Sequence, residues 1–84
     1  MESIVLRIVI FKQEDMYVAQ CLEHDIMVQG PDMDTVKERF EATLELEGDD
    51  LDSIPAAPEA FQKMWDAGLT LESKVDNAEM RLAA

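Results

Sequence analysis

The feature that most constrains this chain is an apolar run close to its beginning. Residues 4–11 read Ile-Val-Leu-Arg-Ile-Val-Ile-Phe, which is β-branched or aromatic almost throughout and contains no Gly or Pro. Such a run is typical of a β-strand that is covered on both faces, or covered on one face and paired through the other. The fold therefore begins with a strand.

Two shorter strands are predicted after this run. Residues 12–15 are polar and form a four-residue turn, after which residues 16–21 return as the second strand of a hairpin. Residues 26–29 predict a third strand. It ends at Gly30 and Pro31, because proline lacks the N–H group that a strand ladder needs.

An amphipathic helix is predicted next. Asp32 suits the N-cap position because its carboxylate can accept hydrogen bonds from the first turn, and Gly48 suits a left-handed position at the C-terminus. An apolar stripe with spacings of three and four runs along one side and consists of Met33, Val36, Phe40 and Leu44. Residues 1–48 are therefore expected to form one acidic α+β core.

The second half of the chain predicts a cover for this core. Residues 49–58 are interpreted as a linker between elements, and Pro58 opens a short second helix that Gly68 closes. That helix carries Phe61, Met64 and Trp65 on one side. Residues 69–75 alternate between apolar and polar, which predicts a half-exposed strand, and residues 76–84 are expected to be a frayed tail or one helical turn.

Together these elements predict a single domain of residues 1–84 with an α+β fold. We expect a three- to four-stranded antiparallel sheet, with one main helix packed on one face and a short second helix. A chain of 84 residues is too short for two independent cores, and its thin core makes self-association a natural source of extra burial. We therefore expect a homodimer, in which residues 4–11 or residues 69–75 contribute to a two-fold interface.

The acidic composition limits the classes of partner. The chain has 7 Lys and Arg against 19 Asp and Glu, a net charge of −12. Direct binding to nucleic acid or to an anionic membrane is not expected, because both need clustered basic side chains. A basic protein would be attracted, although the same charge could serve only to keep a small protein soluble. One cysteine without a disulfide partner, and no segment long enough to span a bilayer, predict a cytoplasmic protein.

Cys21 and His24 form the first candidate site, together with the adjacent Asp25. A Cys-x-x-His spacing suits one half of a zinc site, but the chain contains no other Cys or His, so no metal and no cofactor is expected. The same pair could act as a thiol nucleophile with its base, or His24 could act alone. No further basic group or glycine-rich oxyanion loop supports such chemistry, and no catalytic residue is assigned.

The outer side of the predicted main helix offers a second candidate site. Four acidic residues recur there at spacings of three and four, namely Asp34, Glu38, Glu41 and Glu45. They form a candidate docking surface for a partner protein. The alternative interpretation is that they are simply the solvated face of an exposed helix.

Residues 17–26, which read Tyr-Val-Ala-Gln-Cys-Leu-Glu-His-Asp-Ile, are followed by Val-Gln-Gly at 28–30 and by the predicted helix. This order of segments resembles HicB-like proteins. The resemblance covers residues 4–48 and implies a sheet with a helix on one face, often dimeric, that binds another protein. HicB antitoxins block HicA toxins, which are small basic RNA-cleaving proteins.

The chain departs from full-length HicB antitoxins in its second half. Those proteins carry a C-terminal domain for operator DNA, whereas residues 49–84 here hold 3 basic and 8 acidic side chains, a net charge of −5. We therefore expect a short stand-alone member that acts as a protein-binding module, possessing no enzyme activity and neutralising a small basic toxin. The alternative is a small enzyme or ligand-binding protein that uses the Cys21–His24 loop.

Overall fold

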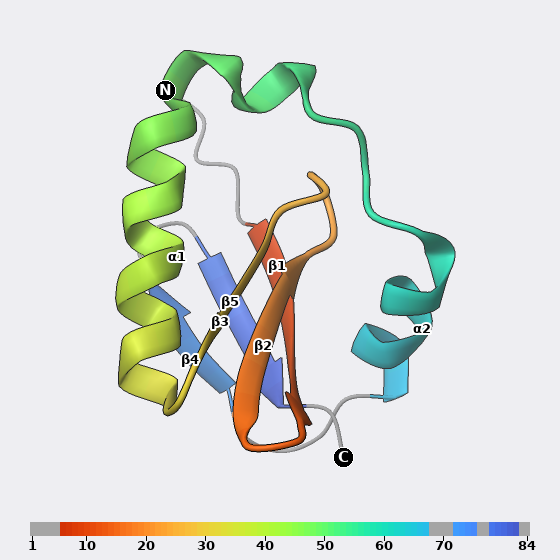
Figure 1. Cartoon of the computed structure of the whole chain (residues 1–84). Coiled ribbons are helices and arrows are strands. Elements are labelled where there is room, and N and C mark those ends of the chain that lie inside the picture. Colours follow the sequence, from red (N-terminus) through yellow and green to blue (C-terminus); the bar gives the residue numbers. More distant parts are fainter. Residues whose placement is uncertain (1–5, 68–71, 76–77, 83–84) are drawn as a thin grey trace.

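The computed structural model describes residues 6–67, 72–75 and 78–82, and Figure 1 shows their arrangement. The elements in chain order are β1 (Leu6–Gln13), β2 (Met16–Cys21), β3 (Met27–Gly30), α1 (Met33–Glu47), the 3-10 helix η1 (Gly48–Ser53), α2 (Glu59–Ala67), β4 (Glu72–Val75) and β5 (Ala78–Leu82). The α+β class predicted from the sequence is confirmed.

The sheet is wider than predicted, and it is mixed. Its five strands lie in the order β3-β2-β1-β5-β4. β1 pairs antiparallel with β2, but it pairs parallel with β5, with Leu6 opposite Ala78 and Ile10 opposite Leu82. The expected antiparallel pairing is confirmed for three of the four strand pairs, but the sheet has a fifth strand and the pair of β1 with β5 is parallel. A parallel pair needs a long crossover, and here everything between β1 and β5 supplies it.

β1 is covered on both faces, which is one of the two arrangements that its composition predicted. Ile8 and Ile10 are fully buried in the core cluster beneath α1, and Val9 between them is fully buried against Trp65 of α2. Figure 1 shows the sheet standing between α1 and α2. Residues 6–10 of β1 have a neighbouring strand on each edge, since β5 pairs with them on the side away from β2.

The hairpin between β1 and β2 is tighter than expected. Gln13 pairs directly with Met16, so the turn consists of Glu14 and Asp15 rather than of residues 12–15. Glu14 has φ of +58°, in the left-handed region that two-residue hairpin turns use.

Both predicted ends of α1 are confirmed. The Asp32 side chain accepts a hydrogen bond from the N–H of Thr35 at 2.8 Å, and this bond lowers the pKa of the Asp32 carboxyl group. Gly48 has φ of +41°, and its N–H donates to the carbonyl of Leu44. Gly30 is needed for a different reason, since a Cβ atom there would lie 3.0 Å from Thr35 Cγ2. The lack of a Cβ atom at position 30 lets β3 approach α1 closely.

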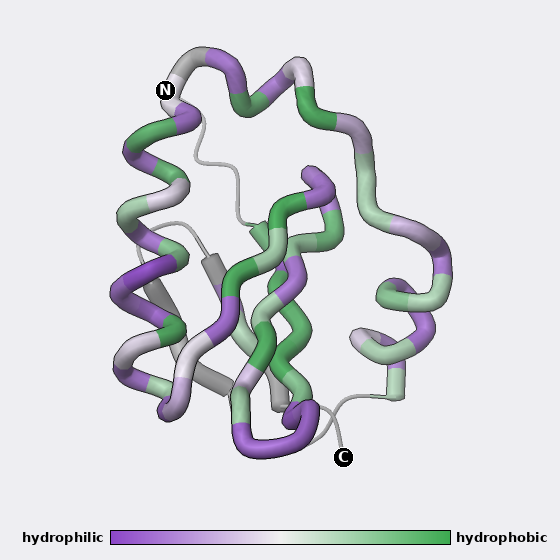
Figure 2. Tube along the Cα trace, viewed as in Figure 1, coloured by the Kyte–Doolittle hydropathy of each residue, from purple (hydrophilic) through white to green (hydrophobic). Residues whose placement is uncertain are grey.

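The predicted apolar stripe of α1 faces the sheet. Val36 and Phe40 are fully buried, while Met33 and Leu44 pack against the same cluster from its border. In Figure 2, hydrophobic colour dominates β1, whereas hydrophilic colour recurs at each turn of α1. Burial of this stripe is what holds α1 in place, because its acidic outer side adds no favourable pairs.

The C-terminal elements correct one prediction and confirm part of another. β4 confirms a strand within residues 69–75, while residues 68–71, including the predicted helix end at Gly68, lie outside the described residues. The expected tail or helical turn is wrong for residues 78–82, because β5 occupies them and lies beside β1. Met80 of β5 is 1% exposed and belongs to the core beneath α1.

The stretch predicted as a linker is partly helical. Residues 48–53 form η1, and α2 begins at Glu59, one residue after Pro58. α2 places Phe61, Met64 and Trp65 against β1, and the Phe61 ring stacks 6.2 Å from the ring of Phe11. α2 therefore acts as the cover on the second face of the sheet.

Candidate functional site

The outer side of α1 brings together the four predicted acidic residues. Asp34, Glu38, Glu41 and Glu45 are all exposed, on the side of the helix opposite the buried Val36 and Phe40. We call these four residues the acidic face. Within the described part of the chain, none of the four carboxylates takes part in a hydrogen bond or an ion pair. The acidic face thus carries four exposed carboxylates that no basic side chain of the described residues pairs.

The loop of residues 21–25, the other candidate site, is fastened to the segment that follows η1. The N–H of Asp25 donates to the carbonyl of Pro55 at 2.6 Å. His24 Nδ1 lies 3.0 Å from the carbonyl oxygen of Ile54, which accepts a hydrogen bond when Nδ1 carries the proton. His24 therefore holds two chain segments together in this structure.

The side chains of Cys21 and Asp25 have structural partners as well. Cys21 is fully buried in the core beneath α1, and Asp25 Oδ1 accepts a hydrogen bond from Gln20 Nε2 at 3.0 Å. Burial raises the pKa of the Cys21 thiol, and nearby backbone N–H groups of His24 and Glu23 oppose this rise only in part. A buried thiol with a raised pKa is a poor nucleophile at neutral pH, because the thiolate is the reactive form.

Cys21 is therefore expected to resist alkylation in the folded protein. Its reaction with iodoacetamide should be about a hundredfold slower than in denaturant, because the thiol must wait for local opening. The control is a chain with Cys21→Ala and Ser53→Cys, which moves the thiol to an exposed position and should react at the same rate folded or unfolded. Fast labelling of folded Cys21 would contradict its burial and would support the alternative in which Cys21 acts as a nucleophile.

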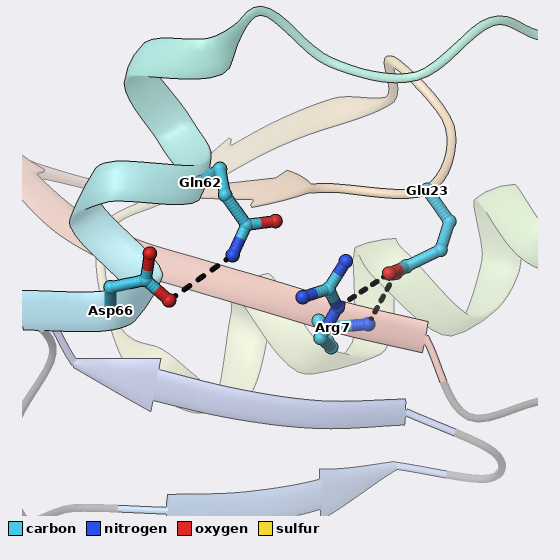
Figure 3. Close-up of polar contacts among 4 residues, drawn as sticks. All are labelled: Arg7, Glu23, Gln62 and Asp66. Carbon is cyan, nitrogen blue, oxygen red and sulfur yellow. Dashed lines mark hydrogen bonds and ion pairs between the residues drawn. The ribbon is translucent and has the colours of Figure 1, made fainter.

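Arg7 joins three parts of the molecule, a role that sequence reasoning missed. Its backbone N–H donates to Glu23 Oε1 at 2.7 Å and its Nε donates to Glu23 Oε2 at 2.6 Å, while the guanidinium carbon lies 5.9 Å from the centre of a Trp65 ring. Figure 3 shows Arg7 between the loop that carries Glu23 and the helix that carries Gln62 and Asp66. In the sequence, the only indication of this role is that Arg7 interrupts the apolar run of residues 4–11.

Two further properties bear on function. Among the described residues, no group of three or more His, Cys, Asp or Glu is placed so that it could hold a metal ion. None of the helices in the described ranges has the length and apolar character needed to cross a membrane.

Comparisons with protein-family models, with curated proteins and with solved structures returned no match for this chain. The HicB-like resemblance therefore depends on the order of segments in residues 4–48.

Proposed function

We propose that this chain is a protein-binding module similar in role to HicB antitoxins, and that it neutralises a small basic RNA-cleaving protein of the HicA kind. The observation that carries the proposal is the acidic face of α1. Its four carboxylates are exposed and have no partner in the described structure, so a cationic surface can approach them without breaking any existing contact.

The distribution of charge supports a basic partner. Residues 23–50, which include β3 and α1, hold 2 basic and 10 acidic side chains, a net charge of −8 out of −12 for the whole chain. A one-sided field of this kind steers an oppositely charged protein toward the surface and raises its association rate. Because a toxin that cleaves RNA must itself bind phosphates, it presents the complementary basic surface.

We prefer a binding role to catalysis because the side chains of the loop of residues 21–25 are already buried or hydrogen-bonded. The Cys21 thiol is buried, His24 is engaged by Ile54, and Asp25 is engaged by Gln20. On this proposal the protein acts in the cytoplasm, where RNA-cleaving toxins have their substrates. A homodimer would use β4, which is the outermost strand opposite β3 among the described strands.

The test is inhibition of a purified HicA-type RNase by this protein. A variant with Asp34→Asn, Glu38→Gln, Glu41→Gln and Glu45→Gln removes the charge of the acidic face but keeps the shape of the side chains. Exposed ion pairs contribute about 0.2–1 kcal/mol each, so inhibition should weaken about tenfold to a hundredfold at low salt. The difference should shrink as salt screens the charges.

A matched control changes the same number of charges elsewhere. Glu14→Gln, Asp15→Asn, Asp52→Asn and Glu59→Gln alter four exposed carboxylates away from α1 and also bring the net charge to −8, since −12 plus 4 is −8. This control should inhibit almost as well as the original protein. If both variants lose inhibition equally, only net charge matters, and if the original protein does not inhibit at all, the antitoxin proposal fails.

A further inference from the structure

The outer edge of β3 presents backbone groups that no strand of the described structure pairs. β3 is an end strand of the sheet, with β2 as its neighbour. Gln20 lies opposite Met27 in the β2–β3 ladder, and one residue further on the N–H of Cys21 donates to the carbonyl of Ile26 at 2.9 Å, which sets the alternation of inward and outward backbone groups along β3. Because such pairs alternate, the N–H and C=O groups of Met27 and Gln29 point away from β2.

The chain itself closes both ends of this edge and leaves its centre open. On one side the N–H of Asp25 donates to the carbonyl of Pro55, and on the other the Gln29 carbonyl accepts from Arg39 Nη1 at 2.6 Å. Met27 N–H, Met27 C=O and Gln29 N–H lie between these closures. Exposed edges are commonly protected in proteins, because an open edge recruits another strand.

Two exposed apolar side chains border the same edge. Met27 is 61% exposed and Leu46 is 85% exposed, the two large hydrophobic residues that stand out among the described side chains. Leu46 lies seven residues after Arg39, so both project from nearly the same side of α1. Since Arg39 reaches Gln29 of β3, that side of α1 faces the open edge. Val28 packs into the cluster beneath α1, so Met27 next to it points to the other face of the sheet, and the two exposed side chains flank the edge from opposite faces.

We infer that the open edge of β3 binds an extended segment of a second protein in which basic and apolar residues alternate, so that this segment becomes a sixth strand of the sheet. The inference rests on the proposed function and names where the basic partner docks. Backbone hydrogen bonds to Met27 and Gln29 hold the segment. Its apolar side chains share the sheet face of Met27, and its basic side chains point to the α1 side, where the acidic residues of α1 lie. A second copy of this chain is disfavoured as occupant, because it brings the same −8 over residues 23–50.

The first test follows backbone amide signals by NMR while a short peptide of alternating Lys and Val is added to the full chain. The signals of Met27 and Gln29 should shift, and their N–H groups should become protected from hydrogen exchange because they enter a new ladder. A peptide of equal charge with Pro in place of Val cannot form that ladder, and it should leave both N–H groups unprotected.

Variants of this chain separate the edge from charge alone. Met27→Pro removes an outward N–H at an edge position where proline is tolerated, and peptide affinity should fall about tenfold, whereas Met27→Ala should keep most of it. Arg39→Ala frees the Gln29 carbonyl and should raise affinity about threefold to tenfold above the matched charge change Lys37→Ala. Lys37 is not in contact with the β3 edge through any hydrogen bond of the described structure.

The outcomes that overturn the inference are distinct from failure of the proposed function. If Met27 and Gln29 remain unprotected while amides near Glu38, Glu41 and Glu45 shift, the basic segment docks on the acidic face and the edge is not the site. Equal protection by the Pro peptide would also exclude strand addition. If the chain forms a dimer that Met27→Pro dissociates, the edge belongs to a second copy. The RNase inhibition assay decides the antitoxin role independently of all three.

Discussion

Replacing Phe40 by Ala is expected to lower the free energy of unfolding by about 3–5 kcal/mol. Phe40 is fully buried and is the largest side chain that α1 inserts into the core, where it lies in one cluster with Ile8, Ile10 and Met80. Its removal forfeits the transfer of an aromatic ring from water and leaves a cavity that the neighbouring strands cannot fill completely. A domain of this length has a total stability of about 4–13 kcal/mol, so the loss is a large fraction of it, and at the lower end of this range the variant would be largely unfolded.

The measurement is urea denaturation followed by circular dichroism. The matched control is Leu46→Ala on the same helix, where the side chain is 85% exposed and the stability change should stay within about 0.5 kcal/mol. Phe40→Leu, which keeps most of the volume, should cost much less than Phe40→Ala. Equal stability of the Phe40→Ala variant and the original protein would mean that α1 does not pack on the sheet through this residue.

Replacing Met80 by Ala is expected to cost about 2–5 kcal/mol, although the sequence places it in what was interpreted as a tail. Met80 is 1% exposed and lies opposite Ile8 in the parallel pair of β1 and β5. The variant loses a buried thioether side chain from the cluster beneath α1, and with it part of the force that holds β5 against β1. The chain end would then be easier to separate from the sheet.

Met27→Ala supplies the control for the second prediction. Both residues are strand methionines, but Met27 is 61% exposed, so its truncation should change stability by no more than about 0.5 kcal/mol. Hydrogen exchange adds a local measure, because protection of the β5 amides should fall in Met80→Ala before global unfolding. If both substitutions had the same small effect, residues 78–82 would be a tail in solution, and the pairing of β5 with β1 would be refuted.

These substitutions also distinguish folding from binding. Phe40→Ala should weaken any interaction only through lost stability of the domain, which a lowered melting temperature detects. Neutralising the acidic face should weaken binding while leaving the fold intact or slightly more stable, because pairs such as Asp34 with Glu38 repel each other by a few tenths of a kcal/mol. Loss of binding together with unchanged stability is therefore the signature expected of a docking surface.

The candidate sites differ in how well the sequence located them. The acidic face could be predicted, because helical spacing alone places Asp34, Glu38, Glu41 and Glu45 on one side and the apolar stripe on the other. The loop was harder to interpret. Its spacing indicated reactive chemistry, but whether Cys21 faces solvent or core depends on the side of β2 that α1 covers, and only the assembled layers decide that.

The β3 edge could not be foreseen from residues 26–29. An edge strand can be identified only from the order of strands in the sheet. That order depends on β5 pairing with β1 instead of β3. The hydrogen bonds that cover the two ends of this edge join Asp25 to Pro55 and Gln29 to Arg39. The partners are distant in sequence, and nothing in the sequence indicates that they meet. Such contacts reflect loop closure and packing rather than local preference.

The apolar run with which the chain begins illustrates the division between sequence and tertiary structure. Local physical chemistry was sufficient for the strands near the start and for α1 with its cap at Asp32 and its end at Gly48, because these depend on residues that are neighbours along the chain. The parallel pairing of β1 with β5, the burial of Met80 and the open edge of β3 were decided only in the folded molecule. The reason is that many segments can satisfy the edges of a strand such as β1, and the choice among them is made by the simultaneous packing of both faces.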